Sequence, residues 1–243
     1  VETDPKLDKV ESALPGVNCG GCGYASCALY AQAIVEQDEE LNLCVVGGAE
    51  TTKDVARVMG VEVSGEQHEK LVAVVFCQGD DEAAKFPGVY RGIEDCAAAI
   101  YSQDVSKRCK YGCVGMGSCV KSCPFDAIHL SEGGIPYVDA EKCTACGNCV
   151  RACPRDLIEL HPVSHNSFVY CKSQDPGPVA RKVCKKACIA CKACVKAAAK
   201  DENEDAVTMH GNLAVVTPDP YAAKPEYGAK CPTDAYASGI NSI

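Results

Sequence analysis

Four cysteines in a single run constrain this chain more than any other feature. Cys143, Cys146, Cys149 and Cys153 are separated by two, two and three residues, and Pro154 follows. This is the spacing of bacterial ferredoxins, in which three cysteines bind one [4Fe-4S] cluster and the fourth binds the other cluster of a pair. Zinc sites use two separated pairs of ligands instead. The run therefore predicts two neighbouring clusters.

The composition also suits a chain that is cross-linked by cofactors. It has 20 cysteines in 243 residues, but no Trp and only 4 Phe. A chain so poor in large apolar side chains needs disulfides or metal to hold small domains together. Half-cystines are rarely this dense in repeated register, which disfavours disulfides. The net charge of −9 excludes a nucleic-acid binder, because such a protein needs a basic face.

Residues 105–170 and 171–243 form two related units. Each contains a predicted hairpin, with strands at 127–130 and 135–138 in the first and at 206–209 and 213–216 in the second. Gly134 precedes Cys153 by 19 residues, and Asn212 precedes Cys231 by the same number. The register predicts two copies of one ferredoxin-like fold.

The first unit is predicted to hold two clusters. One would use the thiols Cys123, Cys143, Cys146 and Cys149. The other has an imperfect motif, because Met116 occupies the place of its middle cysteine. Cys109 is the nearest thiol that could replace it, so the predicted ligands are Cys109, Cys113, Cys119 and Cys153. The alternative is that Met116 marks a lost or three-iron cluster.

The second unit lacks one complete set of ligands. In register with Cys123, Cys143, Cys146 and Cys149 it has Ala198, Tyr221, Lys224 and Tyr227. The other set is complete, namely Cys188, Cys191, Cys194 and Cys231. Random decay would remove ligands from both sets. The second unit is therefore a degenerate repeat that keeps one cluster.

Residues 1–50 form a separate predicted domain with a third kind of motif. Four cysteines lie on a glycine-rich loop, a helix start and a return loop: Cys19, Cys22, Cys27 and Cys44. Glycine allows the backbone to approach a cluster closely, so we expect a fourth [4Fe-4S] cluster here. Helices are expected at 4–14 and 26–40. The fold class is α+β, and residues 51–104 are expected to be a connector with a strand at 72–76 and a short helix at 92–101.

Four cysteines remain outside these sets: Cys77, Cys96, Cys171 and Cys184. They are scattered along the chain, and we expect them to be buried structural thiols. Cys77 and Cys171 each follow a predicted strand, and Cys184 is in register with Cys109. The match between Cys184 and Cys109 counts against Cys109 as a cluster ligand.

One stretch of the chain is basic. It surrounds the C-terminal motif and consists of Lys182, Lys185, Lys186, Lys192 and Lys196. A solvated face is the ordinary role of such a run. Complementary charge also speeds encounter between proteins, so the stretch is a candidate docking site for an acidic ferredoxin.

The chain resembles the B subunit of the Rnf electron-transport complex, the ion-translocating ferredoxin:NAD oxidoreductase. The resemblance covers nearly the whole chain and rests on the segment 14–24 (LPGVNCGGCGY), on Cys27, on Cys44 with Gly47-Gly48, and on the order of the repeats. It implies a component of a translocase that accepts electrons from reduced ferredoxin and passes them to other subunits. It further implies location at the cytoplasmic face of the membrane, anchored by an N-terminal helix that would precede this chain.

The missing ligand set departs from family members with two complete double-cluster units. No nucleophile–base pair, phosphate-binding loop or flavin motif is present, so we expect no substrate-transforming site. The alternatives are a soluble polyferredoxin-like module of a hydrogenase or dehydrogenase, and a zinc-stabilised interaction protein.

Overall fold

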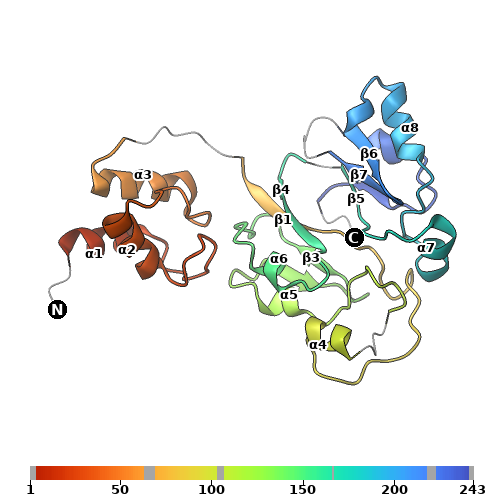
Figure 1. Cartoon of the computed structure of the whole chain (residues 1–243), viewed down its shortest axis with the longest axis horizontal. Helices are drawn as coiled ribbons and strands as arrows, with labels where there is room; N and C mark the ends of the chain where they lie inside the picture. The colour runs from red at the N-terminus through yellow and green to blue at the C-terminus, as the bar shows by residue number, and fades with distance from the viewer. Residues whose placement is uncertain (1–3, 63–68, 103–106, 166, 218–222, 241–243) are drawn as a thin grey trace. The chain divides into compact units, whose positions relative to one another are not determined.

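The computed structural model describes residues 4–62, 69–102, 107–165, 167–217 and 223–240 (Figure 1). The chain falls into two compact units. Unit 1 comprises 1–70 and 144–148, and unit 2 comprises 71–143 and 149–243. Short helices and two-stranded sheets make up the described residues, which confirms the predicted α+β class.

Unit 1 consists of three helices around a small core. They are α1 (Pro5–Ala13), α2 (Cys27–Gln37) and α3 (Gly48–Met59). The side chains of Asp4 and Ser26 accept hydrogen bonds from backbone N–H groups in the first turns of α1 and α2, which sets where each helix begins. The core is built from Val10, Leu14, Tyr30, Ala31, Ile34 and Val55.

Unit 2 contains the other elements, apart from the first residue of α6. The helices are α4 (Cys96–Tyr101), α5 (Ser118–Lys121), α6 (Asn148–Ala152), α7 (Gly177–Val183), α8 (Ala193–Lys200), η1 (Glu204–Ala206) and η2 (Pro225–Gly228). The strands are β1 (Leu71–Val75), β2 (Ile128–Leu130), β3 (Pro136–Val138), β4 (Ile158–Pro162), β5 (Ser167–Val169), β6 (Val207–His210), β7 (Leu213–Val216) and β8 (Tyr236–Ser238).

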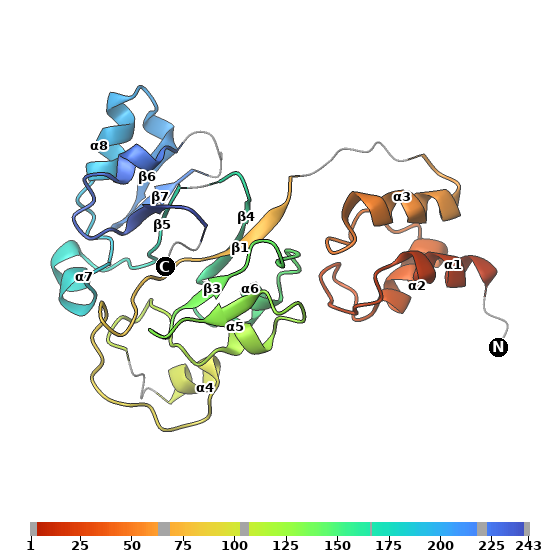
Figure 2. The ribbon, with the colours of Figure 1, turned by 180° about the vertical axis from the view of Figure 1, so that it is seen from behind.

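The strand pairing repeats itself within unit 2. Hairpin β2–β3 of the first repeat corresponds to hairpin β6–β7 of the second (Figure 2). In addition, β1 pairs antiparallel with β4, and β5 pairs antiparallel with β8. In both repeats the second partner begins five residues after the cysteine of the Cys-Pro pair. Each repeat therefore has two antiparallel ladders: a hairpin between its two groups of cysteines, and a pairing of the strand before these groups with the strand after them.

The elements predicted from the sequence are present, with shifted ends. The strand expected at 72–76 is β1, and it pairs within unit 2, whereas α3 belongs to unit 1. The expected connector 51–104 is thus divided between the units. The helix expected at 92–101 begins only at Cys96, because the side chain of Asp95 caps it by accepting a hydrogen bond from the N–H of Ala98 at 2.9 Å.

Candidate iron–sulfur sites

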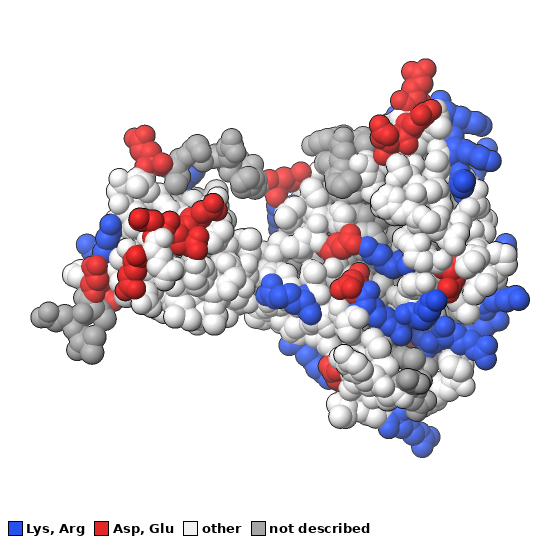
Figure 3. Space-filling model, viewed as in Figure 1, with Lys and Arg blue, Asp and Glu red and all other residues white. Residues whose placement is uncertain are grey.

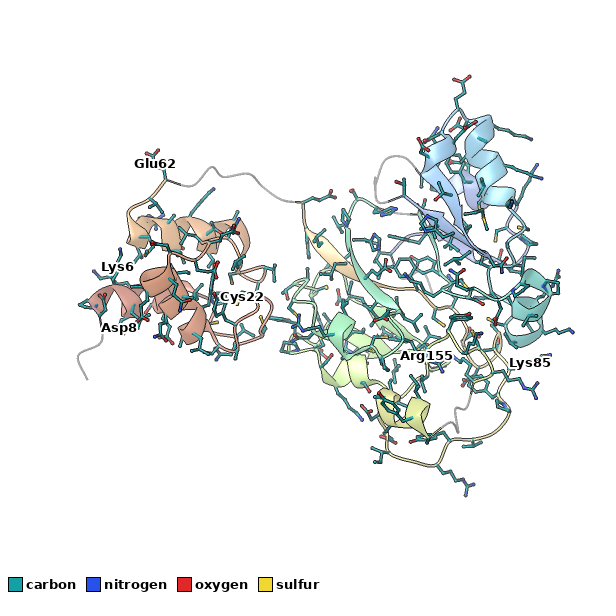
Figure 4. The ribbon with its side chains drawn as sticks, in the orientation of Figure 1. Lys6, Asp8, Cys22, Glu62, Lys85 and Arg155 are labelled. Atoms are coloured by element: carbon teal, nitrogen blue, oxygen red, sulfur yellow. The ribbon has the colours of Figure 1, made fainter. Side chains whose placement is uncertain are left out.

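The other three cysteines of the predicted set in unit 1 lie near Cys44. Burial raises the pKa of Cys44, and the thiols of Cys27, Cys22 and Cys19 contribute to the rise. Tyr30 fixes the return loop, since its hydroxyl donates to the carbonyl of Glu40 at 2.7 Å and accepts from the N–H of Leu43 at 3.2 Å. Figure 4 shows Cys22 within this unit. The arrangement fits the predicted four-thiolate site.

Backbone amides also point at these sulfur atoms. The N–H of Gly21 donates to Cys19 Sγ at 3.5 Å, and a backbone hydrogen bond from Gly47 opposes the rise in the pKa of Cys44. Asn18 accepts from the N–H of Cys27 at 2.8 Å, which fixes the start of α2 against the loop. Hydrogen bonds to sulfur are the usual means by which a protein stabilises a cluster and sets its potential.

The C-terminal set forms a second site. Cys188, Cys191, Cys194 and Cys231 all line one cavity of about 330 Å³, together with Tyr236. Burial raises the pKa of Cys194 to about 11, and the other three thiols raise it further. Buried thiols that hold their protons this strongly need a cation among them to become thiolates. Four converging thiols with that need fit an iron–sulfur cluster.

A third site lies in the first repeat. A cavity of about 360 Å³ is lined by Cys113, Cys119, Cys153 and Cys96, along with apolar side chains. Burial raises the pKa of Cys113 to about 12 and that of Cys119 to about 11, the latter with further contributions from Cys96 and Cys153. The predicted ligand Cys109 does not line this cavity. The structure brings Cys96 here in its place.

Hydrogen bonds explain why Cys96 reaches this cavity. The hydroxyl of Ser118 accepts from the N–H of Cys96 at 2.8 Å and donates to the carboxylate of Asp95 at 2.9 Å. These contacts join the first residues of α4 and α5, and Cys119 is the second residue of α5. The sequence could not show this, because Cys96 lies 17 residues before Cys113 with no intervening motif.

The remaining predicted set has three of its four cysteines in unit 2. Cys143 is buried, and Cys123 and Cys149 pack around the same apolar cluster as Cys119. The N–H of Ala127 donates to Cys123 Sγ at 3.5 Å. Cys146 lies in the segment 144–148, which belongs to unit 1. The full set of four stays a prediction.

Among the described residues, no three or more His, Cys, Asp or Glu side chains are gathered closely enough to hold a single metal ion. All twenty thiols are unbridged, so no disulfide competes for them.

No described helix is both long and apolar enough to span a bilayer.

The fold and thiol sets define an iron–sulfur protein of the ferredoxin type. The family model described as "Putative Fe-S cluster" matches residues 14–46, and the model described as "4Fe-4S dicluster domain" matches residues 108–157. Three curated relatives cover most of the chain. The B subunit of the ion-translocating oxidoreductase complex of Methanosarcina acetivorans is 45% identical over 81% of this chain and 74% of its own length.

The other two relatives match almost the entire chain. The B subunit of the Na(+)-translocating ferredoxin:NAD(+) oxidoreductase complex of Acetobacterium woodii is 42% identical over 99% of this chain and 70% of its own length. The proton-translocating counterpart of Clostridium ljungdahlii is 42% identical over 97% of this chain and 82% of its own length. The chain belongs to the family of B subunits of ion-translocating ferredoxin:NAD oxidoreductase complexes, as its sequence predicted.

Proposed function

We propose that this chain relays electrons from reduced ferredoxin, through [4Fe-4S] clusters, to other subunits of a membrane-bound ion-translocating oxidoreductase. The observation that carries this is the convergence of four thiols on each of several separate sites. When bound, a [4Fe-4S] cluster takes up and releases single electrons. The residues of this chain supply the thiolates, the N–H donors to sulfur and the burial that set the potentials.

We propose four sets of ligands, of which the second rests on the spacing in the sequence and the other three also on the structure. They are Cys19, Cys22, Cys27 and Cys44; Cys123, Cys143, Cys146 and Cys149; Cys96, Cys113, Cys119 and Cys153; and Cys188, Cys191, Cys194 and Cys231. The third set differs from the sequence prediction, because Cys96 replaces Cys109.

The C-terminal site is the proposed point at which ferredoxin docks. Cys191 is the one exposed cysteine among the twenty. Lys182, Lys185, Lys192 and Lys196 are exposed around it, and Figure 3 shows basic side chains gathered over α7 and α8. An acidic donor would be steered to this face, where a ligand of the cluster reaches the surface.

The proposed location is the cytoplasmic face of the membrane. The proposed clusters need reduced cysteines as ligands, and thiols in the cytoplasm are kept reduced. The relatives' names place these B subunits in ion-translocating complexes, which work at a membrane.

Reduction by ferredoxin tests the proposal. The chain is purified anaerobically and mixed with reduced ferredoxin, and the visible thiolate-to-iron absorption is followed in time. The absorption of the clusters should bleach, and the same chain stripped of iron should give no such signal. Zinc without iron, or iron that reduced ferredoxin leaves oxidised while dithionite reduces it, would contradict the proposed function.

A further inference from the structure

Four cysteines that share no sequence motif meet at one cavity in unit 2. Cys77, Cys109, Cys171 and Cys184 all line a space of about 360 Å³. Each of the four comes from a different segment: the chain after β1, the loop before α5, the chain after β5, and the end of α7. None of the four belongs to the C-terminal set or to the set of unit 1.

The repeat explains why these four residues meet. Cys77 lies two residues after β1, and Cys171 lies two residues after β5. Cys109 and Cys184 lie four residues before equivalent ligands, Cys113 and Cys188. Each repeat therefore contributes the same two positions to the one cavity. Scattered structural thiols would have no reason to occupy matching places in both repeats and to face one another.

The sulfur atoms lie close together in this cavity. A Cβ placed on Gly79 would be 3.3 Å from Cys184 Sγ and 3.7 Å from Cys77 Sγ, so these sulfurs are separated by no more than the sum of these distances. A Cβ on Gly112 would be 3.4 Å from Cys109 Sγ. Burial raises the pKa of Cys184, and the thiols of Cys77 and Cys109 raise it further. Glycine at 79 leaves the space between two of the thiols open.

Backbone N–H groups point at these sulfur atoms, as they do at the other sites. The N–H of Cys113 donates to Cys77 Sγ at 3.3 Å, and that of Ser173 donates to Cys171 Sγ at 3.4 Å. Burial raises the pKa of Cys109, which backbone hydrogen bonds from Tyr111 and Gly112 oppose. A backbone hydrogen bond from Lys186 has the same opposing effect on Cys184. Donors aimed at sulfur favour the thiolate over the thiol.

Positive charge is also buried beside the cavity. Lys107 is 5% exposed, lines the cavity, and donates its ammonium hydrogen to the neutral carbonyl of Gly79. Arg155 is half-buried in unit 2 (Figure 4), and its guanidinium donates to the carbonyls of Cys109, at 2.9 Å, and Gly112. A buried cation is costly unless an anion lies nearby. Four thiolates around a [4Fe-4S] core carry a net charge of about −2 and meet that need.

We infer that Cys77, Cys109, Cys171 and Cys184 together hold a fifth [4Fe-4S] cluster, which joins the two ferredoxin-like repeats. The inference rests on the proposed function, since it assumes that the chain acquires clusters. As each sulfur binds one iron, its thiol loses a proton to solvent. All twenty cysteines are then divided into five sets of four.

The position of this site between the two repeats would allow electrons to pass from one repeat to the other. Cys77 packs with Cys113, a proposed ligand in the first repeat. Cys171 packs against the apolar cluster that contains Cys188 and Cys194 of the second repeat. A backbone hydrogen bond from Cys188 opposes the rise in the pKa of Cys171, which burial raises to about 12. The site thus contacts ligands of a cluster on either side.

Iron and acid-labile sulfide per chain test the inference. The 243-residue chain is purified anaerobically after cluster assembly, and we expect about twenty irons per chain. Cys184→Ala should lower the content by about four irons and reduce the spin count in the EPR spectrum after dithionite reduction. Gln78→Ala is the matched control, since Gln78 is buried and lines the same cavity without a thiol. It should keep the full content.

Double variants identify which thiols share a site. Cys109→Ala with Cys184→Ala should lose no more than the single variant, about four irons, whereas Cys96→Ala with Cys184→Ala should lose about eight. A wild-type content of about sixteen that Cys184→Ala leaves unchanged would overturn the fifth cluster and leave the proposed function standing. A loss of about eight irons from the Cys109/Cys184 pair would also overturn it. A chain without iron would instead refute the proposed function. If Cys184→Ala does not fold, the wild-type content decides between twenty and sixteen.

Discussion

The two ferredoxin-like repeats of unit 2 have the same pattern of strand pairing. They differ at the positions that hold Cys123, Cys146 and Cys149 in the first repeat. In the first repeat, α5 ends at Lys121, and the loop that follows supplies Cys123. In the second, α8 continues to Lys200, and Ala198, in register with Cys123, is fully buried within it. The helix can continue through Ala198 because this residue binds no cluster, so the chain does not have to turn into a ligand loop here.

An aromatic side chain completes the replacement in the second repeat. Tyr227, in register with Cys149, is 3% exposed and packs in the same apolar cluster as Ala198. Its hydroxyl donates to the carboxylate of Asp201 at 2.8 Å, and Lys224, in register with Cys146, pairs with the same carboxylate. Protein packing thus takes the place of the predicted cluster. Ala198 and Tyr227 are thus part of the apolar core of the second repeat.

The retained sites of the two repeats also differ in exposure. The middle ligand of the second repeat, Cys191, is exposed, whereas the same register position in the first repeat is the half-buried Met116. Cys96, which is buried, lines the cavity of the first repeat instead. Of the two proposed sites, the one in the second repeat thus reaches the surface through Cys191, whereas the corresponding thiol of the first repeat, Cys96, is buried.

Removal of iron should make the largest difference between the two repeats. Without clusters, the segment 118–124 loses the groups that hold its thiols, and its amides should exchange with solvent as in an unfolded chain. The amides of 197–203 should keep at least about tenfold protection, because Ala198 and Tyr227 pack without metal. Hydrogen exchange on the chelated chain, with the iron-loaded chain as control, measures this. Equal loss in both segments would contradict the proposed replacement.

The fourth ligand of the first repeat can be exchanged by substitution. Cys96→Ala should lower the iron content by about four irons per chain. Adding Met116→Cys should restore the content, because position 116 is in register with Cys191. Iron analysis and EPR measure both effects. Met116→Cys alone is the control and should change neither; an unchanged content in Cys96→Ala would exclude Cys96 as a ligand.

Tyr227 should stabilise the second repeat chiefly through its ring. Tyr227→Ala should lower the free energy of local opening around α8 by about 3 kcal/mol, because a buried aromatic side chain is removed. Tyr227→Phe keeps the ring and loses only the hydrogen bond to Asp201, so about 1 kcal/mol is expected. Native-state hydrogen exchange of 193–203 measures both. Similar losses from the two variants would mean that the hydroxyl, and not packing, holds this region.

The smallest expected effect concerns the outer surface of the second repeat. Lys185→Glu with Lys196→Glu should slow reduction by acidic ferredoxin about tenfold at low salt, and the difference should shrink at high salt. Stopped-flow bleaching of the clusters measures the rate. Lys6→Glu with Lys9→Glu, which reverses exposed charges of unit 1, is the control and should leave the rate nearly unchanged. A salt-independent rate in all variants would place docking elsewhere.

Much of the fold could be predicted from the sequence because its signals are local. The hairpins around Gly134 and Asn212, the strand at 72–76 and the helix after Ser26 all depend on turn residues, caps and short apolar runs. The pairings of β1 with β4 and of β5 with β8 could not be predicted in the same way. They join segments far apart in the chain, and the sequence of a strand of three or five residues does not indicate which strand it pairs with.

The same division holds for the ligands. Spacing alone predicted the sets whose members share a loop, such as Cys188, Cys191 and Cys194, because two intervening residues are what a thiolate loop needs to follow a cluster. The C-terminal cavity, which also includes Cys231, agrees with that prediction. Only the tertiary structure decided the places of Cys96 and Cys109, and with them the cavity shared by Cys77, Cys171 and Cys184. These thiols come from separate segments, so their meeting depends on strand pairing and on contacts such as that between Asp95 and Ser118, which no local spacing encodes.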